Sequence, residues 1–157
     1  IVSHANAKAV QDSRRNLTDD QIKAVADNGG IVGAVGFLGF VSDDPHPTLD
    51  QLIDHIDHLV KVGGIDHVAL SIDYYHGMHG VADEAAATLA YNSFIETGRW
   101  RPEDYPPPPH KFPKGIDTPR DLVNMTKGLL ARGYSEDATR KILGLNWLRV
   151  LREVWGA

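Results

Sequence analysis

Helix and strand signals alternate along the first half of the chain, and this alternation constrains the fold more than any other feature. Two capping boxes, Thr18 with Gln21 and Thr48 with Gln51, each open a stretch with apolar residues at helical spacing. Each stretch ends at a pair of glycines, and a short apolar run without helical period follows it. The order strand, helix, strand, helix, strand predicts right-handed crossovers and a parallel sheet. We therefore expect an α/β protein.

The second half of the chain is expected to be mainly helical. Residues 99–118 hold six of the nine prolines. Because proline removes a backbone donor and restricts the residue before it, we expect an ordered surface excursion there. Residues 1–157 are expected to form a single domain. The expected helices cover residues 18–28, 48–63, 83–97, 119–132, 135–144 and 146–155, and the expected strands run into His4 and cover residues 31–41 and 67–72.

Composition excludes several classes of function. The net charge is −5 and the two signs are interspersed, which argues against a nucleic-acid surface. The chain has no cysteine, so any metal must be held by His, Asp or Glu. No apolar run approaches the roughly 20 residues that span a bilayer, so we expect no membrane segment. The lack of cysteine fits a cytoplasmic compartment, although a leader on a longer precursor stays open.

The first residues of the chain point to a larger enzyme. Ile1 and Val2 read as the last residues of a buried strand that runs directly into His4. We therefore expect the chain to be the later part of a longer protein. A histidine at the carboxyl end of a parallel strand lies where α/β enzymes keep their chemistry, and imidazole is a common metal ligand. A hydrogen-bonded structural histidine is the alternative.

Two further candidates lie in loops that follow strands. Arg15, beside Arg14, could hold a carboxylate through two parallel hydrogen bonds. A solvated basic turn that pairs with Asp19 or Asp20 is the alternative. Asp73 directly follows the third expected strand, where its carboxylate could bind a substrate amine, a metal or a catalytic water, or only cap the next turn.

Other conspicuous residues have weaker signals. The run of acids and histidines at 54–58 falls within a helix and lacks the spacing of known helical metal motifs, so we expect it to be a polar helix flank. His76 and His79 follow Asp73 and could face a substrate or only solvent. We expect Trp100 and Tyr105 to pack the proline-rich run against the body of the molecule or a partner subunit.

Taken in order, the motifs of the whole chain resemble the renal (membrane) dipeptidase family, which are zinc peptidases of the M19 type related to amidohydrolases. The motifs are Ser3-His4-Ala5-Asn6-Ala7, Ser13-Arg14-Arg15-Asn16, Asn28-Gly29-Gly30, Asp54-His55-Ile56-Asp57-His58, Gly64-Ile65-Asp66-His67-Val68 leading to Asp73, Arg132-Gly133-Tyr134-Ser135-Glu136, Arg140-Lys141-Ile142-Leu143-Gly144 and Asn146-Trp147-Leu148-Arg149-Val150.

The resemblance implies a (β/α)8 barrel of the TIM type with a two-zinc centre at the carboxyl ends of the strands. This chain would supply about the last three βα units and the C-terminal helices. By the same resemblance, His4 is a zinc ligand, Arg15 binds the carboxylate of a dipeptide, and Asp73 is the catalytic-site residue that contacts the substrate amine and the scissile region. The remaining zinc ligands of the family belong to the earlier half of the barrel.

The expected function is therefore zinc-dependent hydrolysis of dipeptides by the full-length enzyme. The family continues after the aspartate with Phe-Asp-Gly, whereas this chain has Tyr74-Tyr75-His76-Gly77, so the choice of dipeptide stays open. One alternative is an inert half-barrel or an assembly partner, which would form a homo-oligomer or pair with an N-terminal half to cover exposed strand edges. The other is an amidohydrolase that acts on another small amide or a lactam.

Overall fold

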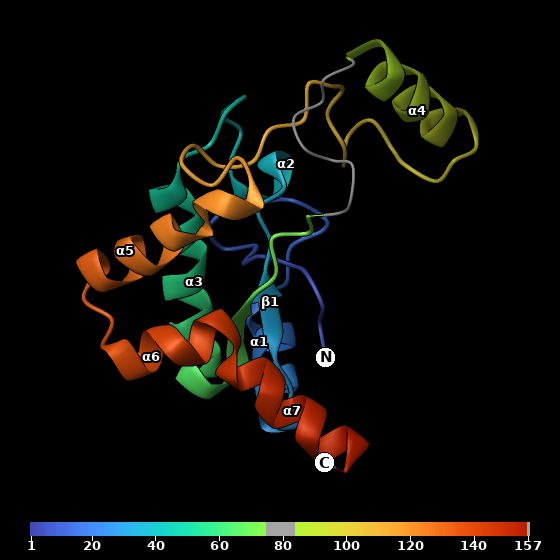
Figure 1. Ribbon diagram of the computed structural model, residues 1–157. Coiled ribbons are helices and arrows are strands. Elements are labelled where there is room, and N and C mark those ends of the chain that lie inside the picture. The colour runs from blue at the N-terminus through green and yellow to red at the C-terminus, as the bar shows by residue number, and fades with distance from the viewer. Residues whose placement is uncertain (75–83, 157) are drawn as a thin grey trace.

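The computed structural model describes residues 1–74 and 84–156 and shows an α/β fold (Figure 1). His76 and His79 lie outside these residues. The α-helices are α1 (Asp19–Asp27), α2 (Leu38–Val41), α3 (Leu49–Gly63), α4 (Glu84–Glu96), α5 (Val123–Arg132), α6 (Glu136–Arg140) and α7 (Asn146–Trp155). The strands are β1 (Val32–Ala34) and β2 (Val68–Leu70). Ile65–His67 and Pro119–Leu122 form 3-10 turns, and Lys141–Leu145 forms a π-helical turn.

Three segments of the chain run parallel and side by side. β1 pairs with β2 in parallel, with Val32 opposite Val68 and Ala34 opposite Leu70. Val2 forms a parallel bridge with Val32 on the other side of β1. The spatial order is therefore the first segment, β1 and β2, each joined to the next by a helix. This arrangement confirms the parallel α/β organisation expected from the alternation of signals.

The second expected strand is wrong beyond Ala34. The apolar run 31–41 predicts a strand that ends near Phe37 to Phe40, but β1 ends at Ala34 and α2 forms a single turn from Leu38. The cause is the buried side chain of Asn6. Its Oδ1 accepts from the backbone N–H of Val35 at 2.9 Å, and its Nδ2 donates to the carbonyl of Val35 at 2.9 Å. Both backbone groups that would continue the ladder at Val35 are therefore taken by a side chain.

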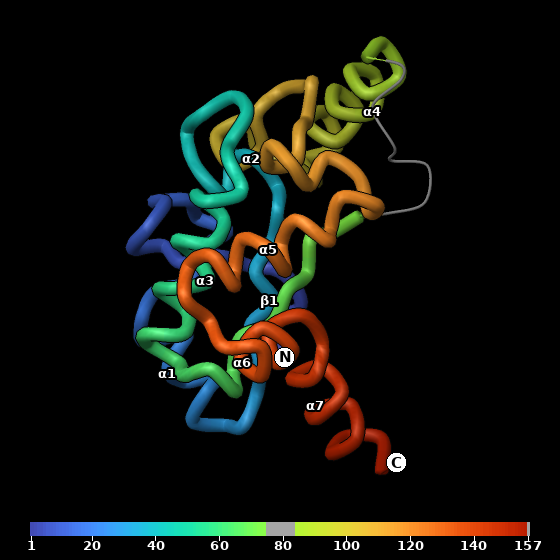
Figure 2. The backbone as a smooth tube through the Cα atoms, turned by 60° about the vertical axis from the view of Figure 1, so that its left-hand side comes forward, coloured from blue at the N-terminus to red at the C-terminus, as the bar shows by residue number. Residues whose placement is uncertain are grey.

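The main core lies between the sheet and the helices α1 and α3. Both capping boxes form as expected and set the starts of these helices. Ile22 of α1 and Ile53 and Ile56 of α3 are buried against Val32 and Val68 of the strands. α3 contacts α1 and also α5, and Figure 2 shows α3 beside these two helices.

The C-terminal helices cover the other parts of the sheet. The two helices expected at 135–144 and 146–155 follow each other almost without interruption, joined by the wide turn Lys141–Leu145. Asn146 donates from Nδ2 to the carbonyl of Val68 at 2.7 Å, and Trp147 donates from Nε1 to the carbonyl of Leu70 at 3.1 Å. The start of α7 thereby satisfies carbonyls of β2 that no strand of this chain pairs with in the described part.

The proline-rich residues 99–118 are irregular, as expected, but lie at the surface only in part. Phe112 and Ile116 are buried in the main core. The earlier part of this segment returns from α4, which stands apart from the sheet at the same end of the molecule as α2 (Figure 1). The aromatic residues of the segment anchor its polar and proline-rich backbone to the body.

Candidate active site

The carboxyl ends of the parallel segments point toward the end of the molecule that carries α2 and α4 (Figure 1). Beyond the bridge of Val2 with Val32 the first segment bends at Ser3 and His4, and the backbone N–H of Ala5, not that of His4, donates to the carbonyl of Gly33 at 2.9 Å. Asp73 follows β2 by three residues. The structure thus places His4 and Asp73 at the ends of two of the three parallel segments, and no hydrogen bond or ion pair joins the two side chains within the described part of the chain.

His4 presents one ring nitrogen to its surroundings. Its side chain is half-buried, and Nδ1 lies 2.7 Å from the hydroxyl oxygen of Ser3. An Nδ1–H that donates to Ser3 leaves the lone pair on Nε2, which is the nitrogen that a metal would take. In that tautomer the Ser3 hydroxyl is the partner that metal-binding histidines commonly have on their second nitrogen.

Asp73 has an unusual backbone conformation at the end of β2. It is exposed and is the non-glycine residue that the described part of the chain holds at positive φ, with φ at 70°. Aspartate tolerates this left-handed region better than most residues, and such conformations gather at functional sites. Tyr74 fixes the next position, because its hydroxyl donates to the carbonyl of Ile116 and its ring packs 4.5 Å from that of Phe112.

Arg15 packs on aromatic rings. Its side chain is exposed, and the guanidinium carbon lies 5.6 Å from the ring centre of Phe40 and 5.7 Å from that of Tyr105. Arg14 lies beside it, with Nε 3.9 Å from Oδ1 of Asp104. The alternative pairing of these arginines with Asp19 or Asp20 does not form in the part of the chain that the structure describes, where Asp19 instead bonds His58 at 2.7 Å.

Two buried asparagines, which the sequence reasoning missed, hold these segments together. Asn6 and Asn16 are nearly inaccessible to solvent. Oδ1 of Asn16 accepts from the backbone N–H of Asn6 at 3.2 Å. Both side chains donate to the carbonyl of Phe40, at 3.1 Å from Asn6 and 2.8 Å from Asn16. Their place in the motifs around His4 and Arg15 was a usable signal, because a polar residue beside a strand end often satisfies backbone groups.

His55 is a structural residue, but it does not lie on an exposed helix flank. It is fully buried in α3. Nδ1 accepts from the backbone N–H of Ala7 at 3.2 Å, and Nε2 lies 2.8 Å from the carbonyl of Val41. The ring must therefore carry its proton on Nε2 and be neutral. Burial lowers its pKa, although the hydrogen bond to Val41 opposes this shift.

The acids around His55 are also engaged in structural contacts. Arg132 donates from Nη1 to Asp54 and to Asp57, each at 2.6 Å, and the hydroxyl of Tyr134 donates to Asp57 at 2.7 Å. The hydrogen bonds that Arg132 donates to these carboxylates, chiefly the one to Asp54, raise its pKa. The run at 54–58 thus joins α3 to α5.

The donor set of this chain does not complete a metal site. Within residues 1–74 and 84–156, no three His, Asp or Glu side chains gather closely enough to hold an ion. His4 is a suitable single ligand, and a zinc site would need further ligands from beyond these residues.

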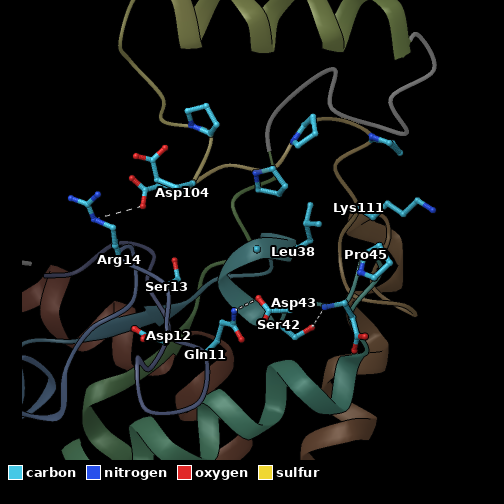
Figure 3. A pocket seen from close by; sticks show the side chains of 17 residues that line it. Gln11, Asp12, Ser13, Arg14, Leu38, Ser42, Asp43, Pro45, Asp104 and Lys111 are labelled. Carbon is cyan, nitrogen blue, oxygen red and sulfur yellow. Dashed lines mark hydrogen bonds and ion pairs between the residues drawn. The ribbon is translucent and has the colours of Figure 1, made fainter.

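A cleft of about 670 Å³ lies next to this region, between residues 11–14, 38–45 and 102–111 (Figure 3). Two of the acidic side chains that line the cleft have polar partners in the lining. Figure 3 shows Arg14 facing Asp104, and Gln11 donating to Asp43 at 2.7 Å. Arg14 lines the cleft, but His4, Arg15 and Asp73 do not. The cleft therefore lies beside these three candidates and does not contain them.

Comparison with known proteins identifies the family. The family model of the membrane dipeptidases, peptidase family M19, matches residues 1–97. The chain belongs to this family. The match includes His4, Arg15 and Asp73 and ends before the proline-rich segment.

Individual relatives agree with this membership. Dipeptidase ataJ of Aspergillus terreus is 26% identical over 98% of this chain and 30% of its own length. The crystal structure of an amidohydrolase from Pseudomonas aeruginosa is 30% identical, with a TM-score of 0.80 over 98% of this chain and 45% of that protein. A metallopeptidase from Rhodobacter sphaeroides, solved with a phosphinate mimic of the dipeptide L-Ala-D-Ala, is 25% identical, with a TM-score of 0.69 over 95% of this chain and 34% of that protein.

The chain spans less than half the length of these M19 relatives. None of the helices in the described part of the chain is long and apolar enough to cross a membrane.

Proposed function

We propose that the protein hydrolyses dipeptides with the help of zinc, at the carboxyl ends of the strands of a (β/α)8 barrel. This chain would contribute about the last three βα units and the C-terminal helices, as a single domain. The parallel order of the first segment, β1 and β2, with α1 and α3 as crossovers, supports this placement. The observation that carries the proposal is the match of the membrane dipeptidase family model to residues 1–97, which include His4, Arg15 and Asp73.

The two charged side chains suit the two ends of a dipeptide. A free dipeptide carries a carboxylate and an ammonium group on either side of its amide bond. Arg15 binds the carboxylate through the N–H donors of its guanidinium, which lies over the rings of Phe40 and Tyr105. Asp73 accepts hydrogen bonds from the ammonium group and places the scissile amide between the two. Both contacts select short substrates with free termini.

Zinc dependence rests on His4 together with ligands supplied by the rest of the protein. His4 offers Nε2 while Ser3 holds Nδ1 and thereby fixes the plane of the ring. In such sites zinc polarises the amide carbonyl and lowers the pKa of a bound water. Ser3 and His4 contribute orientation in this chain, and Arg15 and Asp73 contribute binding.

Kinetics of an Arg15→Ala variant in the full-length protein test the proposal. A charge-assisted bidentate pair contributes about 1.5–3 kcal/mol, so we expect KM for dipeptides to rise by about 10- to 100-fold. Arg140→Ala, which removes an exposed arginine from α6, should leave KM unchanged. An unaltered KM and kcat in Arg15→Ala would contradict the assignment of the carboxylate site.

The same assay separates the alternative functions. Zinc binding and turnover of dipeptides would exclude an inert half-barrel. Turnover of a lactam or another small amide without turnover of dipeptides would identify an amidohydrolase of different specificity, which the likeness to the Pseudomonas aeruginosa amidohydrolase favours as second candidate.

A further inference from the structure

The rings beneath Arg15 belong to a larger aromatic cluster that joins two distant parts of the chain. Phe37 and Phe40 come from α2 and the residue before it, whereas the other members come from the proline-rich segment. The aromatic cluster consists of Phe37, Phe40, Trp100, Tyr105 and His110.

Tyr105 lies at the centre of this cluster and is held on both sides. Trp100 stacks on it with ring centres 4.4 Å apart and planes at 2°. Phe37 and Phe40 meet it edge-on, at 5.8 Å and 5.6 Å between ring centres. The hydroxyl of Tyr91 in α4 donates to the backbone carbonyl of Tyr105 at 3.1 Å. Ring and backbone are therefore both fixed before any ligand binds.

Two consecutive residues of the proline-rich segment contact two consecutive arginines. Asp104 lies against Arg14, and Tyr105 lies under Arg15. Phe40 supplies the second ring under Arg15, and its carbonyl is held by the buried Asn16 next to Arg15 in sequence. The loop that carries Arg15 is thus clamped between α2 on one side and the segment near residue 105 on the other.

This arrangement restricts Arg15, and within residues 1–74 and 84–156 no hydrogen bond engages the donors of its guanidinium. An exposed arginine samples many rotamers and loses this freedom when it binds a ligand. Ring faces hold a guanidinium by cation–π contact and stacking, which engage the face of the group and not its N–H donors. A carboxylate that approaches in the plane of the guanidinium therefore meets donors that are already oriented.

We propose that Tyr105 is a positioning residue for Arg15, which makes the proline-rich segment part of the site that receives the substrate carboxylate. The inference rests on the proposed role of Arg15 and goes beyond it, because Tyr105 lies outside residues 1–97 that the family model matches. Tyr105 itself does not touch the substrate. It acts by keeping Arg15 in the conformation that binds.

Substitution of Tyr105 in the full-length protein tests this role by kinetics. Tyr105→Leu and Tyr105→Met both remove the ring, with a branched and an unbranched side chain, and Tyr105→Phe keeps the ring. Each is assayed with a dipeptide that has a free carboxylate and with the same dipeptide as its C-terminal amide. We expect Leu and Met to raise KM for the free carboxylate by about three- to tenfold with kcat unchanged, and Phe to behave like the unsubstituted protein.

Trp155→Leu is the control. Trp155 is an exposed aromatic residue at the end of α7, at the opposite end of the molecule from α2 and α4 (Figure 1). Its loss should leave KM for both substrates unchanged. If Tyr105→Leu and Tyr105→Met changed KM for the acid and the amide equally, or changed neither, the positioning role would be wrong.

The signal of the Arg15 Nε–H proton in an NMR spectrum provides a second readout that needs no turnover. Ring currents from Tyr105 and Phe40 should shift this proton upfield, and the shift should shrink in Tyr105→Met but persist in Tyr105→Phe. Titration with N-acetylglycine, but not with its amide, should move the signal, at concentrations several-fold lower with the ring present. Equal affinity with and without the ring would overturn the proposal, whereas failure of the unsubstituted protein to cleave any dipeptide would overturn only the proposed function.

Discussion

At the scale of single residues, the end of β2 combines a side chain that we propose binds substrate with a backbone conformation that few residues adopt. Asp73 has φ at 70°, which most residues adopt at a cost of about 1–2 kcal/mol and glycine at none. A residue chosen only for stability at this position would be glycine or asparagine. The stability of the turn therefore does not explain the aspartate, which agrees with the proposed contact of its carboxylate with a substrate amine.

Substitution of Asp73 should separate stability from activity. Asp73→Gly and Asp73→Asn should leave the free energy of unfolding unchanged or raise it slightly, and Asp73→Ala should lower it by about 1 kcal/mol. All three should lower kcat/KM for dipeptides by at least about tenfold, because the contact with the ammonium group is lost or weakened. Urea denaturation and steady-state kinetics measure the two effects.

Asp27→Asn is the control for this prediction. Asp27 is an exposed residue at the end of α1, and its removal should change neither quantity. A fully active Asp73→Asn variant would show that the negative charge of Asp73 has no role.

At the scale of elements, the segments on either side of β1 leave no room for a side chain at Gly33. A Cβ atom at this position would lie 2.4 Å from the backbone oxygen of Ser3 and 2.7 Å from Cβ of Ser71. The first contact is with backbone, so it can be relieved only by moving the segment that carries His4. Close packing of β1 against its neighbours and the placement of His4 therefore depend on the same glycine.

Gly33→Ala should displace this segment. Overpacking of this kind costs typically about 1–3 kcal/mol, and we expect a corresponding loss in thermal unfolding experiments together with a lower kcat/KM. Gly144→Ala is the matched control, because a Cβ atom there meets nothing within 4 Å and should be tolerated. Unchanged stability and activity in Gly33→Ala would mean that the first segment moves freely relative to β1.

The elements also show what local sequence can and cannot predict. Both capping boxes predicted the starts of α1 and α3, because their hydrogen bonds join residues three positions apart. The end of β1 could not be predicted in the same way, since it depends on Asn6, which lies 29 residues before Val35. The contact of Arg15 with Tyr105 joins residues even farther apart, and no local pattern announces it. The motifs pointed to His4, Arg15 and Asp73, whereas the groups that hold these segments in place became visible only in three dimensions.

At the scale of the whole molecule, His55 links the layers of the fold. Its ring lies in α3 and bonds the backbone of Ala7 just after the first segment and of Val41 at the end of α2. Asn6 and Asn16 join the same two regions through Phe40. Buried polar side chains from three parts of the chain thus fix the end of the sheet at which His4 and Arg15 lie.

The neutral state of His55 makes stability depend on pH. Burial lowers its pKa in the folded protein below the ordinary value of 6.5. As the pH falls below about 6.5, the unfolded chain takes up a proton that the folded protein does not bind, so the free energy of unfolding decreases. The contribution of His55 is present in full above this pH and is lost progressively toward the lower folded pKa. One proton of difference corresponds to at most about 1.4 kcal/mol per pH unit.

Urea denaturation between pH 7.5 and pH 5.5, with the unsubstituted protein and a His55→Gln variant, measures this effect. Glutamine can donate to Val41 and accept from Ala7 but does not titrate, so the variant should be less stable at pH 7.5 and lose less stability on acidification. The difference between the two curves isolates His55 from the other histidines, which both proteins share. Parallel curves would mean that His55 binds a proton equally in the folded and unfolded states, which a ring that must accept a hydrogen bond from Ala7 cannot do without breaking that bond.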